Sequence, residues 1–338
     1  MPSSITRRGV LIGGAIAGLG AAACGSDGED PPLPVAATGP APAEPPALPP
    51  AAPAPPTPTT PAGVLPTRPF GRTGVEVTIL GLGGGHGVAD TRELGVQIVE
   101  KAYAQGIRFF DAAPIYNHCQ SNYGEVLEKR RSSVFLQTKT MARDRDGALR
   151  ELETSLKAMR TDHLDSWMLH DIRFDADLDQ ILGPGGAMEA FTQAVDEKMV
   201  RFIGASCHSY PQTLKRLLEA HSLDCAIMSL NAADWYDKPF APSVLPVAVA
   251  QNIGIVAMKT LGYGNLLKAI SAQDALGWAL TQPISVAIVG VHRLEDIDQN
   301  TAFARAFKPL SATELASVVE RAKVVAHDAT FFRRDQWA

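Results

Sequence analysis

The sequence predicts an α/β protein, namely a closed barrel of eight parallel strands and eight helices, the (β/α)8 or TIM barrel. A hairpin is expected before the barrel and an extra helix after it. Eight short, continuous apolar runs rich in β-branched residues alternate with amphipathic segments, as expected for strands that are buried on both faces. Eight is also the number of strands that closes such a barrel. The 272 residues that follow a proline-rich leader suffice for a single α/β barrel, which typically takes about 250 residues.

An open, doubly wound sheet is the alternative for the same alternation of strands and helices. That fold needs a glycine-rich phosphate-binding turn after its first strand. The glycine-rich run GLGGGHG at residues 81–87 does not fit G-x-G-x-x-G in any register. The barrel is therefore the favoured fold.

The individual elements follow in order along the chain. Strands are expected at residues 77–83, 107–112, 134–139, 165–170, 202–206, 226–230, 253–258 and 285–290. Helices are expected between them, for example at residues 92–105, 146–159, 187–198 and 211–220. The segment RPFGRTGVEV at residues 68–77 has the glycine content of a hairpin. Ser311 and Glu314 form a capping box that opens the extra C-terminal helix.

The composition excludes several classes of protein. The chain has 338 residues, a net charge of −5, 46% hydrophobic residues and four cysteines. These values exclude a wholly disordered chain, a disulfide-stapled miniprotein and a strongly basic nucleic-acid binder. No nucleic-acid partner is therefore expected.

The first residues indicate an export signal. Thr6-Arg7-Arg8-Gly9 precedes an uncharged apolar run at residues 10–24, which is too short to span a membrane. The paired arginines favour the twin-arginine route, which carries folded cargo, over the general secretory route.

Residues 21–24, Ala-Ala-Ala-Cys, admit two processing reactions. They form an Ala-x-Ala cleavage site, and they also resemble a lipobox that would leave Cys24 as an acylated first residue. Fifteen of the 25 prolines lie between Pro31 and Pro66, so a disordered, semi-rigid spacer follows. A spacer of this kind favours a periplasmic, membrane-anchored lipoprotein over a soluble exported protein. The predicted organisation is a signal peptide at 1–24, a linker at 25–66 and the barrel at 67–338.

Polar residues end the apolar runs at the mouth where an α/β barrel carries its active site. Asp111 ends the second predicted strand and Tyr116 follows it, Lys139 ends the third, and His170 ends the fourth. Because these strands are neighbours, the four side chains are expected to converge.

Together these residues could protonate an oxygen while a hydride reaches the adjacent carbon. A free tyrosine has a pKa near 10, which a nearby ammonium lowers. Lys139 would supply that ammonium, Asp111 would hold it, and His170 would orient a substrate carbonyl. Taken singly, each residue is more typical of packing or of a structural ion pair.

Several segments resemble the aldo-keto reductase superfamily in the expected order: FFDAAPIY (109–116), FLQTK (135–139), MLHD (168–171), FIGASCHS (202–209) and IVGVHRLEDIDQN (288–300). The resemblance implies a TIM barrel that reduces aldehydes and ketones with a nicotinamide dinucleotide. It makes Tyr116 the general acid of a tetrad with Asp111, Lys139 and His170. The family's usual cofactor is NADP(H), with NAD(H) as the alternative here.

The resemblance also assigns cofactor contacts, although several positions depart from the family pattern. The positions are Gly83, Gly84, Ser206, Cys207, Asn231, Met258, Lys259, Leu261, Arg293 and Asn300. Cys207 stands where asparagine is expected, and Met258 stands where a tyrosine stacks on the nicotinamide. Asp296 falls where a basic residue would meet a 2′-phosphate.

Two other functions remain alternatives at this point. One is a nucleotide-binding sensor or interaction barrel with little turnover, which the altered cofactor positions favour. The other is a metal-dependent hydrolase, but the chain has no His-x-His after the first strand and no Cys-x-x-Cys pair, so no metal is expected. Without Cys24, three cysteines remain, and a Cys119–Cys207 disulfide across the mouth is left open.

Overall fold

The computed structural model describes residues 65–334. The predicted signal peptide, the acylation site at Cys24 and all but the last two residues of the predicted linker lie outside the described residues. Within residues 65–334, no helix combines the length and apolar character that crossing a membrane requires.

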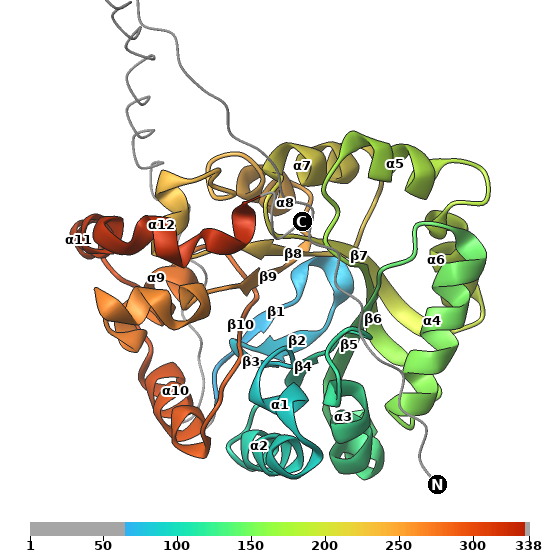
Figure 1. The fold of residues 1–338 in the computed structure, drawn as a ribbon, viewed down its shortest axis with the longest axis horizontal. Helices are drawn as coiled ribbons and strands as arrows, with labels where there is room; N and C mark the ends of the chain where they lie inside the picture. Colours follow the sequence, from blue (N-terminus) through green and yellow to red (C-terminus); the bar gives the residue numbers. More distant parts are fainter. Residues whose placement is uncertain (1–64, 335–338) are drawn as a thin grey trace, which may run out of the picture. The chain divides into compact units, whose positions relative to one another are not determined.

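The described residues contain the predicted closed barrel of eight parallel strands, ringed by helices (Figure 1). Neighbouring strands follow one another along the chain, and the last strand pairs with the first. The strands are β3 (Leu80–Gly83), β4 (Phe109–Asp111), β5 (Phe135–Thr140), β6 (Leu164–Leu169), β7 (Val200–Cys207), β8 (Cys225–Ser229), β9 (Gly254–Met258) and β10 (Val286–Val289).

Helices connect the strands and pack on the outside of the barrel (Figure 1). The longer ones are α2 (Arg92–Ala104), α3 (Cys119–Leu127), α4 (Arg145–Ala158), α5 (Asp175–Leu182), α6 (Ala187–Asp196), α7 (Pro211–Ala220), α9 (Ala272–Thr281), α10 (Leu294–Ala306) and α11 (Ala312–Ala322). Short ones are α1 (Gly87–Asp90), α8 (Leu245–Ala250) and α12 (Ala326–Ala329). The predicted capping box is confirmed, because the Ser311 hydroxyl accepts from the Glu314 N–H and the Glu314 carboxylate accepts from the Ser311 N–H.

The first predicted strand, at residues 77–83, is wrong as a single element. Residues Glu76–Thr78 form β2, which pairs antiparallel with β1 (Thr67–Pro69) in the predicted hairpin. The chain then bends at Ile79 before β3 begins. The Thr78 hydroxyl donates to the carbonyl of Leu80 across this bend. The run at residues 77–83 is therefore divided between two sheets. The division comes from a bend of the backbone, and the composition of the run does not show it.

The hairpin closes the amino-terminal end of the barrel. Phe70 is fully buried, and its ring centre lies 5.8 Å from that of Phe109 and 4.9 Å from that of Phe135. Both partners are the first residues of their strands. A Cβ on Gly254, the first residue of β9, would lie 2.9 Å from the Phe70 ring. Within residues 65–334 this end of the barrel is therefore filled, and the polar strand ends lie at the opposite end.

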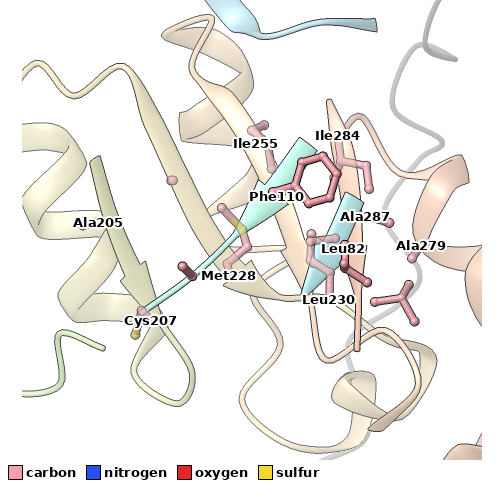
Figure 2. Packing of buried hydrophobic residues seen from close by; sticks show 14 of the residues in the cluster. Leu82, Phe110, Ala205, Cys207, Met228, Leu230, Ile255, Ala279, Ile284 and Ala287 are labelled. Atoms are coloured by element: carbon pink, nitrogen blue, oxygen red, sulfur yellow. The ribbon is translucent and has the colours of Figure 1, made fainter. Parts of the chain in front are cut away.

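The apolar core has two layers on either side of the strands. Inside the barrel, Phe70 packs with inward side chains of the strands, which include Phe109, Phe135, Met168, Ile227, Val256 and Ile288. Between the strands and the helices lies the larger layer, part of which Figure 2 shows, with Leu82, Phe110, Met228 and Ala287. Adjacent residues such as Phe109 and Phe110 belong to different layers because side chains alternate along a strand.

We predict that Phe70→Ala lowers the free energy of unfolding by about 3–5 kcal/mol, because it removes the centre of the packed barrel floor. Urea unfolding followed by circular dichroism measures the change. Val324, which is 82% exposed, provides the control, since Val324→Ala should change stability by less than about 0.5 kcal/mol. Equal stability of the two variants would contradict the assigned packing.

Candidate active site

Side chains alternate in direction along each strand, and this alternation makes the predicted polar residues point inward at the open end of the barrel. Asp111 lies two residues beyond the inward Phe109, and His170 lies two residues beyond the inward Met168. Lys139 lies four residues beyond the inward Phe135. Each therefore points into the barrel, above its apolar interior.

Asp111 and Lys139 form a buried ion pair, as the sequence predicts. The Lys139 Nζ donates to both carboxylate oxygens of Asp111, at 2.7 and 2.9 Å, and to the carbonyl of Ala112 at 2.8 Å. Gln137 donates to the same carboxylate at 2.7 Å and accepts from the hydroxyl of Ser166 at 2.8 Å. The ammonium is thus held in one position by a fully hydrogen-bonded pair.

Tyr116 lies against this pair. Its ring centre is 4.9 Å from the Lys139 Nζ and 5.9 Å from the ring centre of His170, with the two rings perpendicular. A Cβ on Gly85 would lie 3.5 Å from the phenol ring, which is van der Waals contact, so residue 85 leaves this side of the ring uncovered because it is glycine. The structure therefore brings together all four residues that the sequence singled out.

The acidity expected of Tyr116 is not found. Burial raises the pKa of Tyr116 well above its ordinary value of 10, and the Asp111 carboxylate raises it further. The Lys139 ammonium does not outweigh burial and the Asp111 carboxylate, because its charge is already paired with Asp111. Tyr116 is consequently a protonated phenol at neutral pH, which is the form that can donate a proton.

His170 is buried beside the phenol. Burial, together with the charge of Lys139, lowers the pKa of His170 well below its usual value of 6.5, so the imidazole is neutral at pH 7. Its Nδ1 has no hydrogen-bond partner among residues 65–334. A buried ring nitrogen without a partner is costly, so this unpartnered polar atom marks the surroundings of the tetrad as a candidate functional site.

A cavity of about 310 Å³ opens from the tetrad. Asp111, Tyr116 and Lys139 line one end of it, and Asp296 and Gln299 of α10 also line it. Seven of the predicted cofactor contacts line the cavity: Gly83, Gly84, Met258, Lys259, Leu261, Arg293 and Asn300. A Cβ on Gly84 would lie 2.6 Å from the carbonyl of Asp111, so glycine is required where β3 ends.

The other three predicted cofactor contacts do not line this cavity. The Ser206 hydroxyl accepts from the N–H of Asp171, and the Cys207 thiol donates to the carbonyl of Tyr210. Asn231 is fully buried in a reciprocal cap with Asp234. Their contact with a cofactor stays a prediction.

A dinucleotide fits the donors that the structure offers. Tyr116 and Gly85 line the same cavity as the basic Lys259 and Arg293. These groups suit a planar ring at one end and anionic groups along the cavity.

Sequence reasoning missed several residues of the site. Gln137 was overlooked because its role depends on the pairing of β4 and β5, which sets it opposite Asp111. Tyr263 lines the cavity and meets His86 edge to face at 5.3 Å. An aromatic residue between two glycines, Gly262 and Gly264, was the available signal.

The three cysteines of the described chain are buried and free, so the structure contains no Cys119–Cys207 disulfide. Burial raises the pKa of Cys207 to about 12 and raises the pKa values of Cys119 and Cys225 as well. These thiols are therefore packing groups and not nucleophiles. Within residues 65–334, no group of three or more His, Cys, Asp or Glu side chains could hold a metal ion.

Fold and site together define an oxidoreductase-type α/β barrel, with a phenol, a lysine, a carboxylate and an imidazole at its mouth. Residues 79–274 match the aldo/keto reductase family, and the chain belongs to that family.

Two relatives and one solved structure illustrate the similarity. Pyridoxal 4-dehydrogenase of Microbacterium luteolum is 24% identical over 277 residues, which are 68% of this chain and 80% of that protein. Methylglyoxal reductase DkgB of Salmonella typhimurium is 26% identical over 211 residues, 56% of this chain and 74% of that protein. The holo form of an aldo-keto reductase from Bacillus halodurans superposes with a TM-score of 0.65 at 19% identity, covering 76% of this chain and 96% of its own. At that identity the superposition supports the fold alone.

Proposed function

We propose that this barrel transfers a hydride between a nicotinamide dinucleotide and an aldehyde or ketone, with Tyr116 as the general acid in reduction. One observation carries the proposal, namely the packing of Tyr116 between the Lys139–Asp111 pair and His170 at the wall of one cavity. The two relatives support a small aldehyde as the substrate class, because their names specify pyridoxal and methylglyoxal.

Each of the four residues has its own role in the proposed reaction. The bound dinucleotide would supply or accept the hydride at the substrate carbon. The neutral His170 would donate a hydrogen bond to the carbonyl oxygen and orient it. Tyr116 would transfer its phenolic proton to the same oxygen as negative charge develops there.

Lys139 acts on the step that leaves Tyr116 as a phenolate. Burial lowers the pKa of Lys139, while Asp111 opposes that fall, so the pair keeps an ammonium in a low-dielectric site. The new phenolate would lie close to this ammonium, which favours proton transfer when the substrate oxygen accepts it. Gln137 fixes the Asp111 carboxylate and so positions the ammonium.

A sensor barrel that binds a dinucleotide with little turnover is the second candidate. Met258 favours it, because this thioether lines the cavity where the family places a stacking tyrosine, and it is a poorer platform than an aromatic face. Dinucleotide binding with no reduction of any aldehyde would select this candidate.

Tyr116→Phe tests the assigned acid. We expect kcat for aldehyde reduction to fall by about 100-fold or more, because general acid catalysis is typically worth 10²–10⁴-fold, while the Kd for NADPH stays within about twofold. Initial rates and fluorescence titration measure the two quantities. Tyr236→Phe, outside the cavity, is the matched control, and full activity in Tyr116→Phe would refute the assignment.

The choice between NADP(H) and NAD(H) depends on an ion pair at the start of α10. Arg293 donates to the Asp296 carboxylate at 2.7 Å, and the same carboxylate accepts from the Arg293 N–H. We propose that either dinucleotide can bind. The ion pair with Asp296 would weaken the attraction of Arg293 for the 2′-phosphate of NADP(H).

Asp296→Asn should therefore raise the affinity for NADPH by about three- to tenfold and leave that for NADH within about twofold. The amide keeps a hydrogen-bond acceptor for the helix cap but releases the guanidinium. Titration of both cofactors checks this, with Glu295→Gln as the neighbouring control. An equal change for NADPH and NADH would show that this part of the cavity does not meet the 2′-phosphate.

We further propose that the protein is exported through the twin-arginine route and anchored by a lipid on Cys24, with the barrel in the periplasm. The motif Arg7-Arg8 and the small residues before Cys24 support this proposal. Export of the folded barrel would allow the cofactor to be loaded before transport.

Fractionation of cells that express the protein tests its proposed location. We expect Arg7→Lys together with Arg8→Lys to retain the protein in the cytoplasm, and Cys24→Ala to move it from the membrane to the soluble periplasmic fraction. Membrane association that survives Cys24→Ala would contradict the lipid anchor, and export that survives the arginine replacements would favour the general secretory route.

A further inference from the structure

His208 lies beside the tetrad, and the proposed reaction gives it no role. It directly follows β7, as His170 directly follows β6, and these two strands are paired neighbours. The ring centres of the two histidines are 6.3 Å apart, and the ring centre of Phe332 also lies 6.3 Å from that of His208. Phe332 in turn lies 5.7 Å from Tyr263, which lines the cavity. His208 therefore belongs to the open end of the barrel, next to the reacting groups.

The Asp171 carboxylate holds the His208 ring. Its Oδ1 lies 2.9 Å from Nδ1 of His208 and accepts from the backbone N–H of His208 at 3.0 Å. Its Oδ2 accepts from Nε of Arg173 at 2.7 Å and lies 2.7 Å from Nη2 of the same guanidinium. The backbone of Asp171 is left-handed, with φ of 48°, and its N–H donates to the Ser206 hydroxyl at 2.8 Å. A strained residue held by several hydrogen bonds is typical of functional sites, and here it fixes the carboxylate that orients His208.

The pairing with Asp171 decides which ring nitrogen of His208 is available. Burial opposes ionisation of Asp171, but the hydrogen bond with His208 and the charge of Arg173 hold its pKa below the usual range. A proton must lie between an ionised carboxylate and a ring nitrogen 2.9 Å away, so Nδ1 carries it. Burial lowers the pKa of His208 below 6.5, although Asp171 opposes this fall, so the ring is neutral at pH 7.

The Nε2 atom of this neutral ring is a hydrogen-bond acceptor. It forms no hydrogen bond with residues 65–334, and the His208 side chain remains 16% exposed. The other polar groups of the tetrad are donors in the proposed reaction or are already paired. Tyr116 and His170 donate to the carbonyl oxygen, while the Lys139 ammonium uses its three N–H groups within the protein. His208 thus adds an acceptor beside the donors that bind the carbonyl group.

We propose that His208 is a specificity-determining residue, whose Nε2 accepts a hydrogen bond from a hydroxyl group on the carbon next to the substrate carbonyl. The substrate is then a hydroxy aldehyde or a hydroxy ketone. Hydrogen bonds of about 2.7–3.2 Å allow one small molecule to reach both rings, whose centres are 6.3 Å apart. Asp171 is a positioning residue, because it acts through His208. This proposal deepens the proposed reductase function and rests on it for the carbonyl group that is reduced.

The test compares His208→Asn with His208→Gln. The shorter amide can still donate to Asp171 in place of Nδ1 but ends short of Nε2, whereas the longer amide brings an acceptor oxygen to about the reach of Nε2. His163→Asn is the matched control, because Nδ1 of His163 likewise pairs with a carboxylate, that of Asp162 at 2.6 Å. His163 directly precedes β6 and so lies at the opposite end of the barrel.

Two sets of compounds provide the readouts. The first is kcat/KM for glycolaldehyde, for propanal, which has a methyl group in place of the hydroxyl, and for methoxyacetaldehyde, which keeps the oxygen but cannot donate. The second is the Kd, in the presence of NADPH, of glycolamide and of propanamide, which are carbonyl analogues of the first two compounds.

The native chain should favour glycolaldehyde over propanal and over methoxyacetaldehyde, and glycolamide over propanamide. His208→Asn should lower the ratio of kcat/KM for glycolaldehyde to that for propanal by about three- to tenfold, the effect of losing one hydrogen bond. The preference for glycolamide should fall by a similar factor. His208→Gln should recover most of both losses, and His163→Asn should leave both ratios at their native values.

The proposal is overturned if the native chain binds glycolamide no more tightly than propanamide. It is also overturned if His208→Asn changes the two aldehydes, or the two amides, by the same factor, because that is the result of a purely structural role. The amide titrations need no turnover. A native protein that reduces none of the three aldehydes would therefore count against the reductase function, while the ratio of the amide Kd values would still decide the role of His208.

Discussion

The alternation of side chains along eight closed strands is the constraint on which the rest of the molecule depends. In a closed parallel barrel every second residue must point inward, and the interior must be filled. Phe109, Phe135 and Met168 fill it, with Phe70 of the hairpin below them. The same alternation then brings Asp111, Lys139 and His170 to the open end. The apolar interior and the polar mouth are therefore successive layers of inward-pointing side chains on the same strands. A shift of register in any of these strands would disturb both layers.

The buried charges at the mouth are tolerated because they are paired. Removing a carboxylate and an ammonium from water is costly unless each has partners, and Lys139, Asp111 and Gln137 satisfy one another. The pairing has a chemical consequence, since a lysine neutralised by Asp111 does not make Tyr116 acidic. The phenol remains protonated until a substrate oxygen requires its proton. Lys259, in contrast, is left without a carboxylate partner in the described chain, and its Nζ donates to the Tyr263 hydroxyl.

Much of the fold and the four central site residues could be predicted from the sequence. Continuous apolar runs locate the buried strands, and the polar residue that ends a run lies at the mouth by construction. The bend at Ile79 was missed because an apolar run does not show where the backbone turns. Gln137 and Tyr263 were missed because their partners, Asp111 and His86, are distant in sequence and meet them only across strand pairs or loops.

The order of strands and helices and the convergence of Asp111, Tyr116, Lys139 and His170 were determined by the sequence alone, because they follow from the succession of apolar runs and from the closure of eight strands. The protonation of Tyr116, the pairing of Arg293 with Asp296 and the unneutralised charge of Lys259 were decided only by the tertiary structure. These properties depend on burial and on distances between side chains from different elements, and electrostatic energies change steeply with both.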